Sequence, residues 1–334
     1  MVPRGLSRVT VFSEHAAMAT SRLTPAPAAQ GAEHALIGRA IESLATVIVG
    51  KEHQLRLALA CMLAEGHLLI EDLPGVGKTT LAHALARALG LSYQRIQFTS
   101  DLLPADILGV SVFQRDSGRF EFHHGPIFAH VVLGDEINRA TPKAQSALLE
   151  AMEERQVTAD GHTYALPAPF FVIATRNPEH QIGTFPLPES QLDRFLMQIG
   201  LGYPAPNEER VLLGGGERRR LIEAMQPALS PDALLRLQER VPAVHVSDAL
   251  LDYVQALIAH TRESGQYRHG LSPRGGMALV KAAQAWALMH GHAGVHPEDV
   301  QAVFPAVAVH RLERASRDAP TDPGRSILKT VPVP

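Results

Sequence analysis

The stretch EDLPGVGKTT at residues 71–80 constrains the fold of this chain more than any other part of its sequence. The apolar run HLLIED before it (67–72) predicts a short buried strand, and TTLAHALARALG after it predicts a helix that ends at Gly90. The core of the stretch, Gly75-Val76-Gly77-Lys78-Thr79, matches the second half of a phosphate-binding loop. In such a loop, backbone N–H groups at a helix N-terminus converge on phosphate oxygens. The sequence therefore predicts a nucleotide site.

Two side chains of this loop carry specific expectations. Lys78 is expected to reach the β and γ phosphates, and the hydroxyl of Thr79 to ligate Mg²⁺. The first glycine of the full pattern is absent, because Asp72 stands in its place. A strand–helix turn that contains GKT by chance is the alternative, and the strand–loop–helix context disfavours it. The predicted nucleotide-binding residues are Gly50, at a break between two helical stretches, and Pro74, Gly75, Val76, Gly77, Lys78, Thr79 and Thr80.

A second motif, HVVLGDEINRA at residues 130–140, places two adjacent carboxylates at the end of an apolar run. Burying two neighbouring carboxylates without a positive partner is costly, and nucleotide-bound Mg²⁺ is the expected partner. Asp135 is predicted to hold this Mg²⁺ through water, and Glu136 to polarise the attacking water. Two solvated acids at a strand end are the alternative. The phosphate loop lies upstream at a distance that suits strands of one sheet, which favours the nucleotide site.

Further apolar runs predict strands at 93–98, 129–135, 170–175 and 195–200, with helical patterns between several of them. Strands that alternate with helices predict an α/β fold, here an αβα core with a mainly parallel sheet. Beyond about residue 204 the pattern is helical only, and Ser230, Ser247 and Ser272 are predicted N-caps. An all-α second domain is therefore expected after the core.

Turn signals predict two hairpins inside the core, one over 110–122 around Asp116-Ser117-Gly118 and one over 157–166 around Asp160-Gly161. The predicted organisation of the chain is a disordered segment at 1–35, the nucleotide-binding core at 36–204, a helical lid at 205–315 and a loose tail at 316–334. The two terminal expectations depend on composition, because residues 21–35 are Ala/Pro-rich and the C-terminal tail is polar and Pro-rich.

Composition excludes several classes of protein. The chain is 46% hydrophobic and carries a net charge of −3, which gives no general attraction to nucleic acid or to an anionic membrane. Its single cysteine, Cys61, lies in an apolar stretch, is expected to be a core residue and is compatible with a reducing cytoplasm. No uninterrupted apolar run reaches the length of a membrane-spanning helix, so no transmembrane segment is predicted.

The sequence resembles the MoxR family of AAA+ ATPases, within the group whose members carry an insert in helix 2. The resemblance covers about residues 36–315 and lies in DLPGVGKTTLA, TSDLLPADILG, GPIFAHVVLGDEINRATPKAQSALLEAMEERQVT, PFFVIATRNP, TFPLPESQLDRFLMQI and LSPRGG. It implies an αβα core with a helical lid. The hairpin at 110–122 then matches the helix-2 insert, and that at 157–166 matches the insert before sensor 1.

The same resemblance implies roles for three further residues. Asn177, in ATRNP, matches sensor 1, which orients the attacking water. Arg194, in LDRF, matches the arginine finger that reaches the γ-phosphate of a neighbouring subunit, and Arg274, in SPRGG, matches sensor 2 on the lid. Without the resemblance, both arginines would be read as ordinary surface residues. Arg176 stands where glutamine is common in the family, and its effect stays open.

The resemblance also implies a function. Such proteins use ATP and Mg²⁺, form ring homo-oligomers that are usually hexamers, and remodel or mature partner proteins. A protein with a von Willebrand factor A domain often serves as the adaptor. Two alternatives remain, a nucleotide-switched binding module with negligible turnover and a DNA-acting helix-2-insert ATPase. The acidic charge balance and the lack of an appended DNA-binding motif argue against the second, so no specific nucleic acid is expected.

The histidines of HGHAGVH, His290, His292 and His296, suggest a metal site at first sight. They fall between two predicted helices, with no cysteine or clear set of carboxylates near them in the sequence. A solvated turn is the expected structure of this segment.

Overall fold

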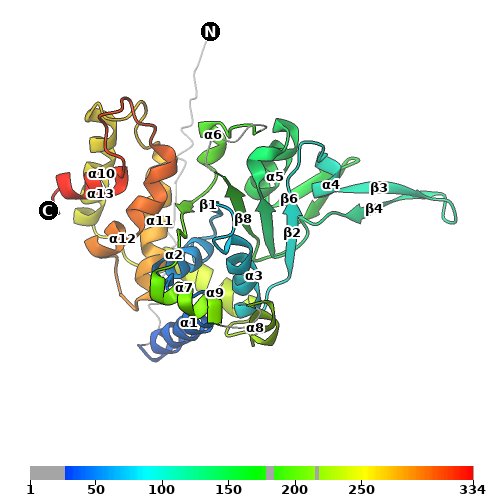
Figure 1. Ribbon diagram of the computed structural model, residues 1–334, viewed down its shortest axis with the longest axis horizontal. Coiled ribbons are helices and arrows are strands. Elements are labelled where there is room, and N and C mark those ends of the chain that lie inside the picture. The colour runs from blue at the N-terminus through cyan, green and yellow to red at the C-terminus, as the bar shows by residue number, and fades with distance from the viewer. Residues whose placement is uncertain (1–26, 178–183, 215–217, 334) are drawn as a thin grey trace, which may run out of the picture.

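The computed structural model describes residues 27–177, 184–214 and 218–333. At its centre is a five-stranded sheet in which every neighbouring pair of strands is parallel (Figure 1). The strand order is β2 (Tyr93–Gln97), β5 (Val131–Asp135), β8 (Phe171–Arg176), β1 (Leu68–Glu71) and β9 (Met197–Ile199). The predicted α/β class with a parallel sheet is therefore confirmed.

Side chains of the sheet alternate between two hydrophobic clusters. In β1, Leu68 and Ile70 belong to one cluster and Leu69 to the other. This division arises because successive side chains of a strand point to opposite faces of the sheet. When both faces are covered, successive positions of the strand are therefore apolar. The same alternation separates Val131 and Leu133 from Val132 in β5, and Phe171 and Ile173 from Val172 and Ala174 in β8.

Helices cover both faces of the sheet. One cluster includes residues of α1 (Pro27–Val47), α2 (Glu52–Leu63) and α3 (Lys78–Ala88). The other includes residues of α4 (Pro104–Leu108), α5 (Pro142–Glu154) and α6 (Glu189–Leu192). These two layers of helices hold the carboxyl ends of the strands in fixed positions. Side chains that follow the strands are therefore also held in place.

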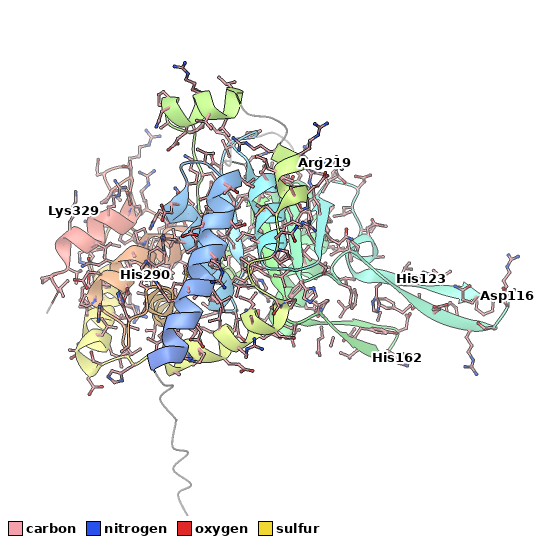
Figure 2. The ribbon with its side chains drawn as sticks, turned by 90° about the horizontal axis from the view of Figure 1, so that it is seen from below. Asp116, His123, His162, Arg219, His290 and Lys329 are labelled. Carbon is pink, nitrogen blue, oxygen red and sulfur yellow. The ribbon has the colours of Figure 1, made fainter. Side chains whose placement is uncertain are left out.

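Two hairpins leave this core on the same side (Figures 1 and 2). β3 (Gly109–Gln114) pairs with β4 (Arg119–His124), and β6 (Gln156–Ala159) pairs with β7 (His162–Ala165). They span the ranges 110–122 and 157–166 in which hairpins were expected. The rings of Phe122 and Tyr164 stack with centroids 4.3 Å apart, so the two hairpins contact each other at their bases.

The chain beyond β9 is helical. Ser230, Ser247 and Ser272 each accept a hydrogen bond from the backbone N–H three residues later, as N-caps do. No helix within the described residues is long and apolar enough to cross a membrane. The helices are α7 (Pro206–Gly214), α8 (Arg218–Ala224), α9 (Pro231–Arg240), α10 (Asp248–Glu263), α11 (Pro273–Met289), α12 (Pro297–Ala308) and α13 (Pro323–Thr330).

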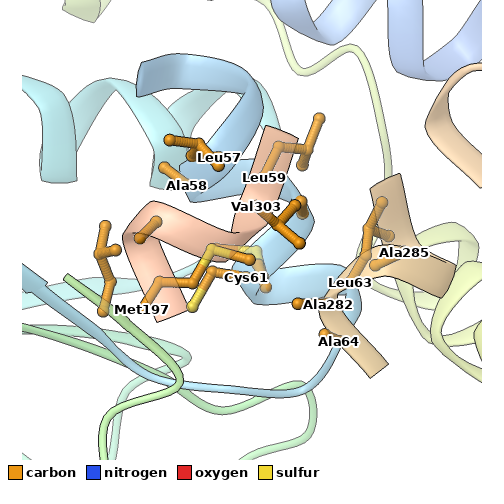
Figure 3. Close-up of a cluster of buried hydrophobic side chains, with 14 of the residues drawn as sticks. Leu57, Ala58, Leu59, Cys61, Leu63, Ala64, Met197, Ala282, Ala285 and Val303 are labelled. Atoms are coloured by element: carbon orange, nitrogen blue, oxygen red, sulfur yellow. The ribbon is translucent and has the colours of Figure 1, made fainter. Parts of the chain in front are cut away.

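The helical region shares its core with the sheet domain. Figure 3 shows Cys61 and its neighbours on α2 packed against Met197 of β9, Ala282 and Ala285 of α11, and Val303 of α12. Cys61 is fully buried there, as expected, and burial raises the pKa of its thiol. Since all these side chains belong to one cluster, the packing continues without interruption from the sheet into α11 and α12.

The structure corrects the expected disorder at the N-terminus. Residues 1–26 lie outside the described residues, but α1 begins at Pro27, so 27–35 are helical. The carboxylate of Glu33 pairs with Arg240 of α9 at 2.7 Å, and Ile37 and Leu44 are buried. The Ala/Pro-rich composition predicted disorder, whereas burial of this apolar face stabilises a helix.

The expected loose tail at 316–334 is also wrong. Asp322 caps α13 by accepting a hydrogen bond from Arg325 N–H at 3.0 Å, and Ile327 is fully buried. At Gly324 a Cβ atom would lie 2.7 Å from that of Pro305, so the backbones of α13 and α12 touch. Proline in this segment does not break a helix, because Pro323 occupies the first turn, where its missing N–H costs nothing.

Buried histidines make the stability of this fold depend on pH. His67 is buried, with Nε2 donating to Met152 O at 3.1 Å and Nδ1 accepting from Val172 N–H at 3.0 Å. Desolvation lowers the pKa of His67 to about 4, and burial holds the pKa of His310 well below its usual range. Unfolding below pH 6.5 therefore takes up protons. The contribution of these neutral histidines to the free energy of unfolding is fully present above this pH. It is lost as the pH falls toward their pKa in the folded state.

We expect the free energy of unfolding to fall between pH 7.5 and 5.5 by about 1.3 kcal/mol for each of His67 and His310. Urea denaturation at the two pH values measures the change. Proton uptake on unfolding at pH 5.5, obtained by calorimetry in buffers of different ionisation enthalpy, is the control. Equal stability at both pH values would contradict the burial of neutral imidazoles.

Candidate active site

The phosphate loop connects β1 to α3, and its backbone depends on glycine at two positions. Gly75 and Gly77 have φ angles of 85° and 100°, in the left-handed region that other residues rarely adopt. Gly77 is the N-cap residue of α3, so the free N–H groups at the start of this helix lie next to the loop. This arrangement offers a binding site for the oxygens of a phosphate chain.

Lys78 is buried directly behind this loop. Its Nζ donates to the carbonyl oxygens of Asp72 at 2.6 Å and Leu73 at 3.2 Å, and to Asn177 Oδ1 at 3.3 Å. Burial lowers the pKa of Lys78, and the carboxylates of Asp72, Asp135 and Glu136 oppose this effect. The ammonium group is thus held in place by neutral oxygens and lies within the field of three acids.

Asp135 is buried at the end of β5. Thr175 Oγ1 donates to its Oδ1 at 2.5 Å, and Arg95 of β2 pairs with its Oδ2 at 2.6 Å. The positive partner within the chain is therefore Arg95, which the sequence did not reveal. Carboxylate and hydroxyl oxygens are the ligands that Mg²⁺ prefers, so Asp135 and the exposed Thr79 suit this ion.

Glu136 has different partners from its neighbour. Its Oε2 accepts from Gln97 Nε2 at 3.0 Å and from Arg139 Nη1 at 2.9 Å, and its Oε1 accepts from Asn177 Nδ2 at 3.2 Å. Its φ of 57° is left-handed, which is uncommon for glutamate, and turns the chain sharply after β5. Adjacent carboxylates are thereby separated into two environments.

Asn177 joins the two motifs of the sequence. Its Oδ1 accepts from Lys78 and its Nδ2 donates to Glu136, so one amide spans the phosphate loop and the second carboxylate. Lys78 begins α3 after β1, Asp135 ends β5 and Asn177 follows β8. Their strands are neighbours in the sheet, and ligands of open α/β sheets bind beyond the carboxyl ends of such strands.

A cavity of about 210 Å³ adjoins the phosphate loop. Of the predicted nucleotide-binding residues, Gly75, Val76, Gly77 and Thr80 line it, whereas Gly50, Pro74, Lys78 and Thr79 do not. Gly50 lies between lining residues, and a Cβ there would collide with the Glu208 carboxylate, 1.9 Å away. The lining residues that the sequence did not single out are Val47, Ile48, Val49, Lys51, Leu201, Gly202, Pro204, Leu212 and Arg218.

Comparison with known proteins gives the family. The model of the ATPase family associated with various cellular activities (AAA) matches residues 67–197, and that of the AAA lid domain matches 259–330. Chaperone MoxR1 of Mycobacterium tuberculosis is 41% identical over 292 residues, covering 84% of this chain and 76% of that protein. Protein MoxR of Paracoccus denitrificans is 36% identical over 303 residues, covering 84% and 89%. The chain belongs to the MoxR family of AAA+ ATPases.

Two further matches support this membership. The uncharacterized protein YeaC of Bacillus subtilis is 48% identical over 279 residues, which cover 84% of this chain and 87% of that protein. A solved structure from Cytophaga hutchinsonii, described as that of a candidate ATPase, superposes with a TM-score of 0.81 at 34% identity. The superposition covers 91% of this MoxR-family chain and 97% of that one.

In this MoxR-family chain, Arg194 and Arg274 lie together and away from the phosphate loop. Arg194 Nη1 donates to Leu149 O at 2.7 Å and pairs with Glu153 Oε2 at 3.1 Å, while Arg274 Nη1 is 3.3 Å from Glu153 Oε1. Both arginines line a cavity of about 390 Å³, and neither lines the cavity beside the phosphate loop. The structure therefore groups them with each other, not with Lys78, Asp135, Glu136 and Asn177.

Arg311, which the sequence did not single out, holds the segment that carries Arg194. Its guanidinium pairs with Asp193 Oδ1 at 2.6 Å and donates to the carbonyl oxygens of Phe195 at 2.7 Å and Leu196 at 3.1 Å. The side chain of Arg311 is only 5% exposed. Because Arg311 follows α12, it ties the backbone around Arg194 to the helical region.

The structure gives the contacts of Arg176, whose effect was left open, and of the histidines between α11 and α12. Arg176 at the end of β8 pairs with Glu71 Oε2 of β1 at 2.6 Å, and Gln198 of β9 donates to the same oxygen. The charge of Arg176 is therefore neutralised by a carboxylate of the neighbouring strand. His292 does have a carboxylate beside it, contrary to expectation, since Asp299 Oδ2 lies 3.0 Å from its Nδ1. The same oxygen accepts from His296 N–H at 2.8 Å at the start of α12, so Asp299 serves as a helix cap.

Proposed function

We propose that this chain binds Mg²⁺–ATP at the phosphate loop and hydrolyses it. The observation that carries the proposal is the contact of Asn177 with both Lys78 and Glu136, which joins a phosphate-binding cation to a potential general base through one amide. A site of this kind needs a phosphate anchor and a group that polarises water within a few ångströms of each other. Membership of an ATPase family supports the same activity.

In this proposal, each residue has a separate task. Backbone N–H groups of the loop and Lys78 bind the β and γ phosphates, and Thr79 and Asp135 hold Mg²⁺, which neutralises phosphate charge. Asn177 and Glu136 orient and polarise the attacking water. Gln97 and Arg139 fix one oxygen of Glu136, so the other oxygen, shared with Asn177, faces the phosphate loop.

We further propose that Arg194 and Arg274 act on the nucleotide of a neighbouring subunit. They share Glu153, line a cavity separate from the phosphate loop, and are partly exposed, with side-chain exposures of 32% and 49%. Arginine stabilises the charge that develops on a transferring phosphoryl group. A ring homo-oligomer, expected to be a hexamer, supplies the neighbour.

The biological role proposed here is the remodelling or maturation of partner proteins. It rests on the family and on the relative named a chaperone in Mycobacterium tuberculosis. The adaptor with a von Willebrand factor A domain and the cytoplasmic location remain predictions from the sequence. A nucleotide switch without turnover is distinguished from this proposal by measuring phosphate release with and without Mg²⁺.

The test of the proposed activity is the replacement of Lys78. We expect Lys78→Ala to abolish turnover, a loss of about 10²-fold or more, because a buried point charge on the β and γ phosphates disappears. Phosphate release and binding of a fluorescent ATP analogue are the measurements. Lys329→Ala, which replaces an exposed lysine on α13, the last described helix, is the matched control (Figure 2). An unchanged rate in Lys78→Ala would remove the assignment of the phosphate loop.

A further inference from the structure

Asp72 connects the phosphate loop to a distant segment of the chain. Its Oδ2 accepts two hydrogen bonds, from Leu201 N–H and Gly202 N–H, each at 2.6 Å. Its Oδ1 accepts from Leu73 N–H at 2.8 Å, and its carbonyl oxygen accepts from Lys78 Nζ at 2.6 Å. One residue therefore contacts the lysine of the phosphate loop through its backbone and a second segment through its carboxylate.

The second segment is a wall of the cavity beside the loop. Leu201, Gly202 and Pro204 line this cavity, and they connect β9 to α7. Leu212 of α7 lines the same cavity farther along the chain. The position of residues 201–204 therefore determines the shape of the part of the site that lies beyond the phosphates.

The side chain of Asp72, not an unusual backbone conformation, distinguishes this position from the glycine of the full pattern. The full phosphate-loop pattern has glycine here, but Asp72 is absent from the described residues with positive φ. A glycine is therefore not required by the conformation of this chain. Hydrogen bonds from N–H groups to a carboxylate are stronger than those between neutral groups. The bonds to Leu201 and Gly202 span 129 and 130 residues, so they do more than cap a local turn.

We propose that Asp72 is a positioning residue that couples occupancy of the phosphate loop to the wall formed by residues 201–204. A phosphate chain that draws Lys78 toward itself changes the bond to the Asp72 carbonyl, and the carboxylate carries this change to Leu201 and Gly202. The wall formed by residues 201–204, which lies beyond the phosphates where the adenine base of ATP would bind, then closes when the phosphates bind. This inference rests on the proposed ATP binding and identifies the residue that links the two halves of that site.

The test uses inorganic tripolyphosphate, which contains the phosphate chain of ATP and no base. Hydrogen exchange of the full chain is followed at Leu201 and Gly202 with and without this probe. In the wild type we expect tripolyphosphate to slow exchange both in the phosphate loop and at residues 201–202. In Asp72→Asn we expect it to slow exchange in the loop only.

Asparagine is the informative replacement because it keeps the shape of the side chain. If its oxygen keeps the bond from Leu73 N–H, its NH₂ group faces the two N–H donors of residues 201 and 202, and donors repel donors. Without any ligand, exchange at Gly202 should therefore rise at least about tenfold. ATP affinity should fall at least about tenfold while tripolyphosphate affinity changes by less than about threefold, since only ATP reaches the wall.

Two further variants keep the test decisive. Asp72→Gly restores the glycine of the loop pattern and should also lose the coupling, even if Asp72→Asn does not fold. Glu208→Gln changes a carboxylate that accepts from Ala205 N–H in the same connection but does not touch the loop, and should keep the response at Leu201.

A response at residues 201–202 that persists in Asp72→Gly, or equal losses of ATP and tripolyphosphate affinity, overturns the coupling. A wild type that binds neither probe overturns the proposed function instead.

Discussion

Arg194→Ala should lower ATP turnover by about 10³-fold or more while ATP affinity stays nearly unchanged. Arg194 is held by Leu149 O and Glu153 and does not line the cavity of its own phosphate loop, so its removal leaves that loop intact. The lost contact acts on the charge of the transition state. Steady-state phosphate release and equilibrium binding of a fluorescent ATP analogue separate the two effects.

Mixing two inactive variants tests whether Arg194 acts between subunits. Arg194→Ala keeps its phosphate loop, and Lys78→Ala keeps its arginine. In mixed rings the second variant can complete the site of the first, so part of the activity should return. The specific activity of the wild type should also rise with protein concentration, because separate chains lack the neighbour's arginine. Activity that is independent of concentration, with no rescue in rings shown to be mixed, would falsify a role between subunits.

Glu136→Gln should still bind Mg²⁺–ATP but hydrolyse it about 10²–10⁴-fold more slowly. The amide keeps the size of the side chain, and its single oxygen can keep the bonds from Gln97 and Arg139. Its NH₂ group cannot accept from Asn177 Nδ2, and the basicity needed to polarise water is lost. Single-turnover phosphate release measures the chemical step directly. Slow hydrolysis should also retain partner proteins on the ATP-bound ring, and these can be identified by co-purification.

Asp135→Asn is the matched comparison for Glu136→Gln. Both replace one carboxylate by an amide, at adjacent positions. Asp135 contacts Thr175 and Arg95, whereas Glu136 contacts Gln97, Arg139 and Asn177. We expect only Asp135→Asn to weaken Mg²⁺ affinity, measured by titrating Mn²⁺ with electron paramagnetic resonance in the presence of ADP. An equal loss in both variants contradicts the separate tasks of the two carboxylates.

Local sequence signals predicted the sheet and the hairpins because each depends on neighbouring residues. Alternation of apolar side chains and the turn residues Asp160-Gly161 are properties of a few consecutive positions. Lys78, Asp135 and Glu136 could be found for the same reason, since the phosphate-loop motif follows one predicted strand and the two carboxylates stand at the end of another. Asn177 was found only through the resemblance to the family, because on its own it would pass as a turn residue at a strand end. The parallel order of the strands then brings their ends together.

Residues that act from far along the chain could not be found in this way. Arg95 faces Asp135 only because β2 pairs with β5, and Leu201 reaches the site only because β9 lies beside β1. The wall at residues 201–204 has no charged or glycine-rich motif. Helix α13 was missed because its stability comes from burial of Ile327 against distant helices, which its proline-rich composition does not indicate.

The hairpin of β3 and β4 has a consequence for how the protein behaves in concentrated solution. It is a two-stranded sheet, so each strand has one edge without a partner within the described residues, and Phe113 and Phe120 are exposed along it. Such edges pair readily with strands of other molecules. Arg115, Asp116, Arg119 and Glu121 place charges of both signs on this hairpin, and burying them against a second copy would cost free energy. These charges are therefore expected to oppose edge-to-edge association of two molecules, as charged side chains do on other edge strands.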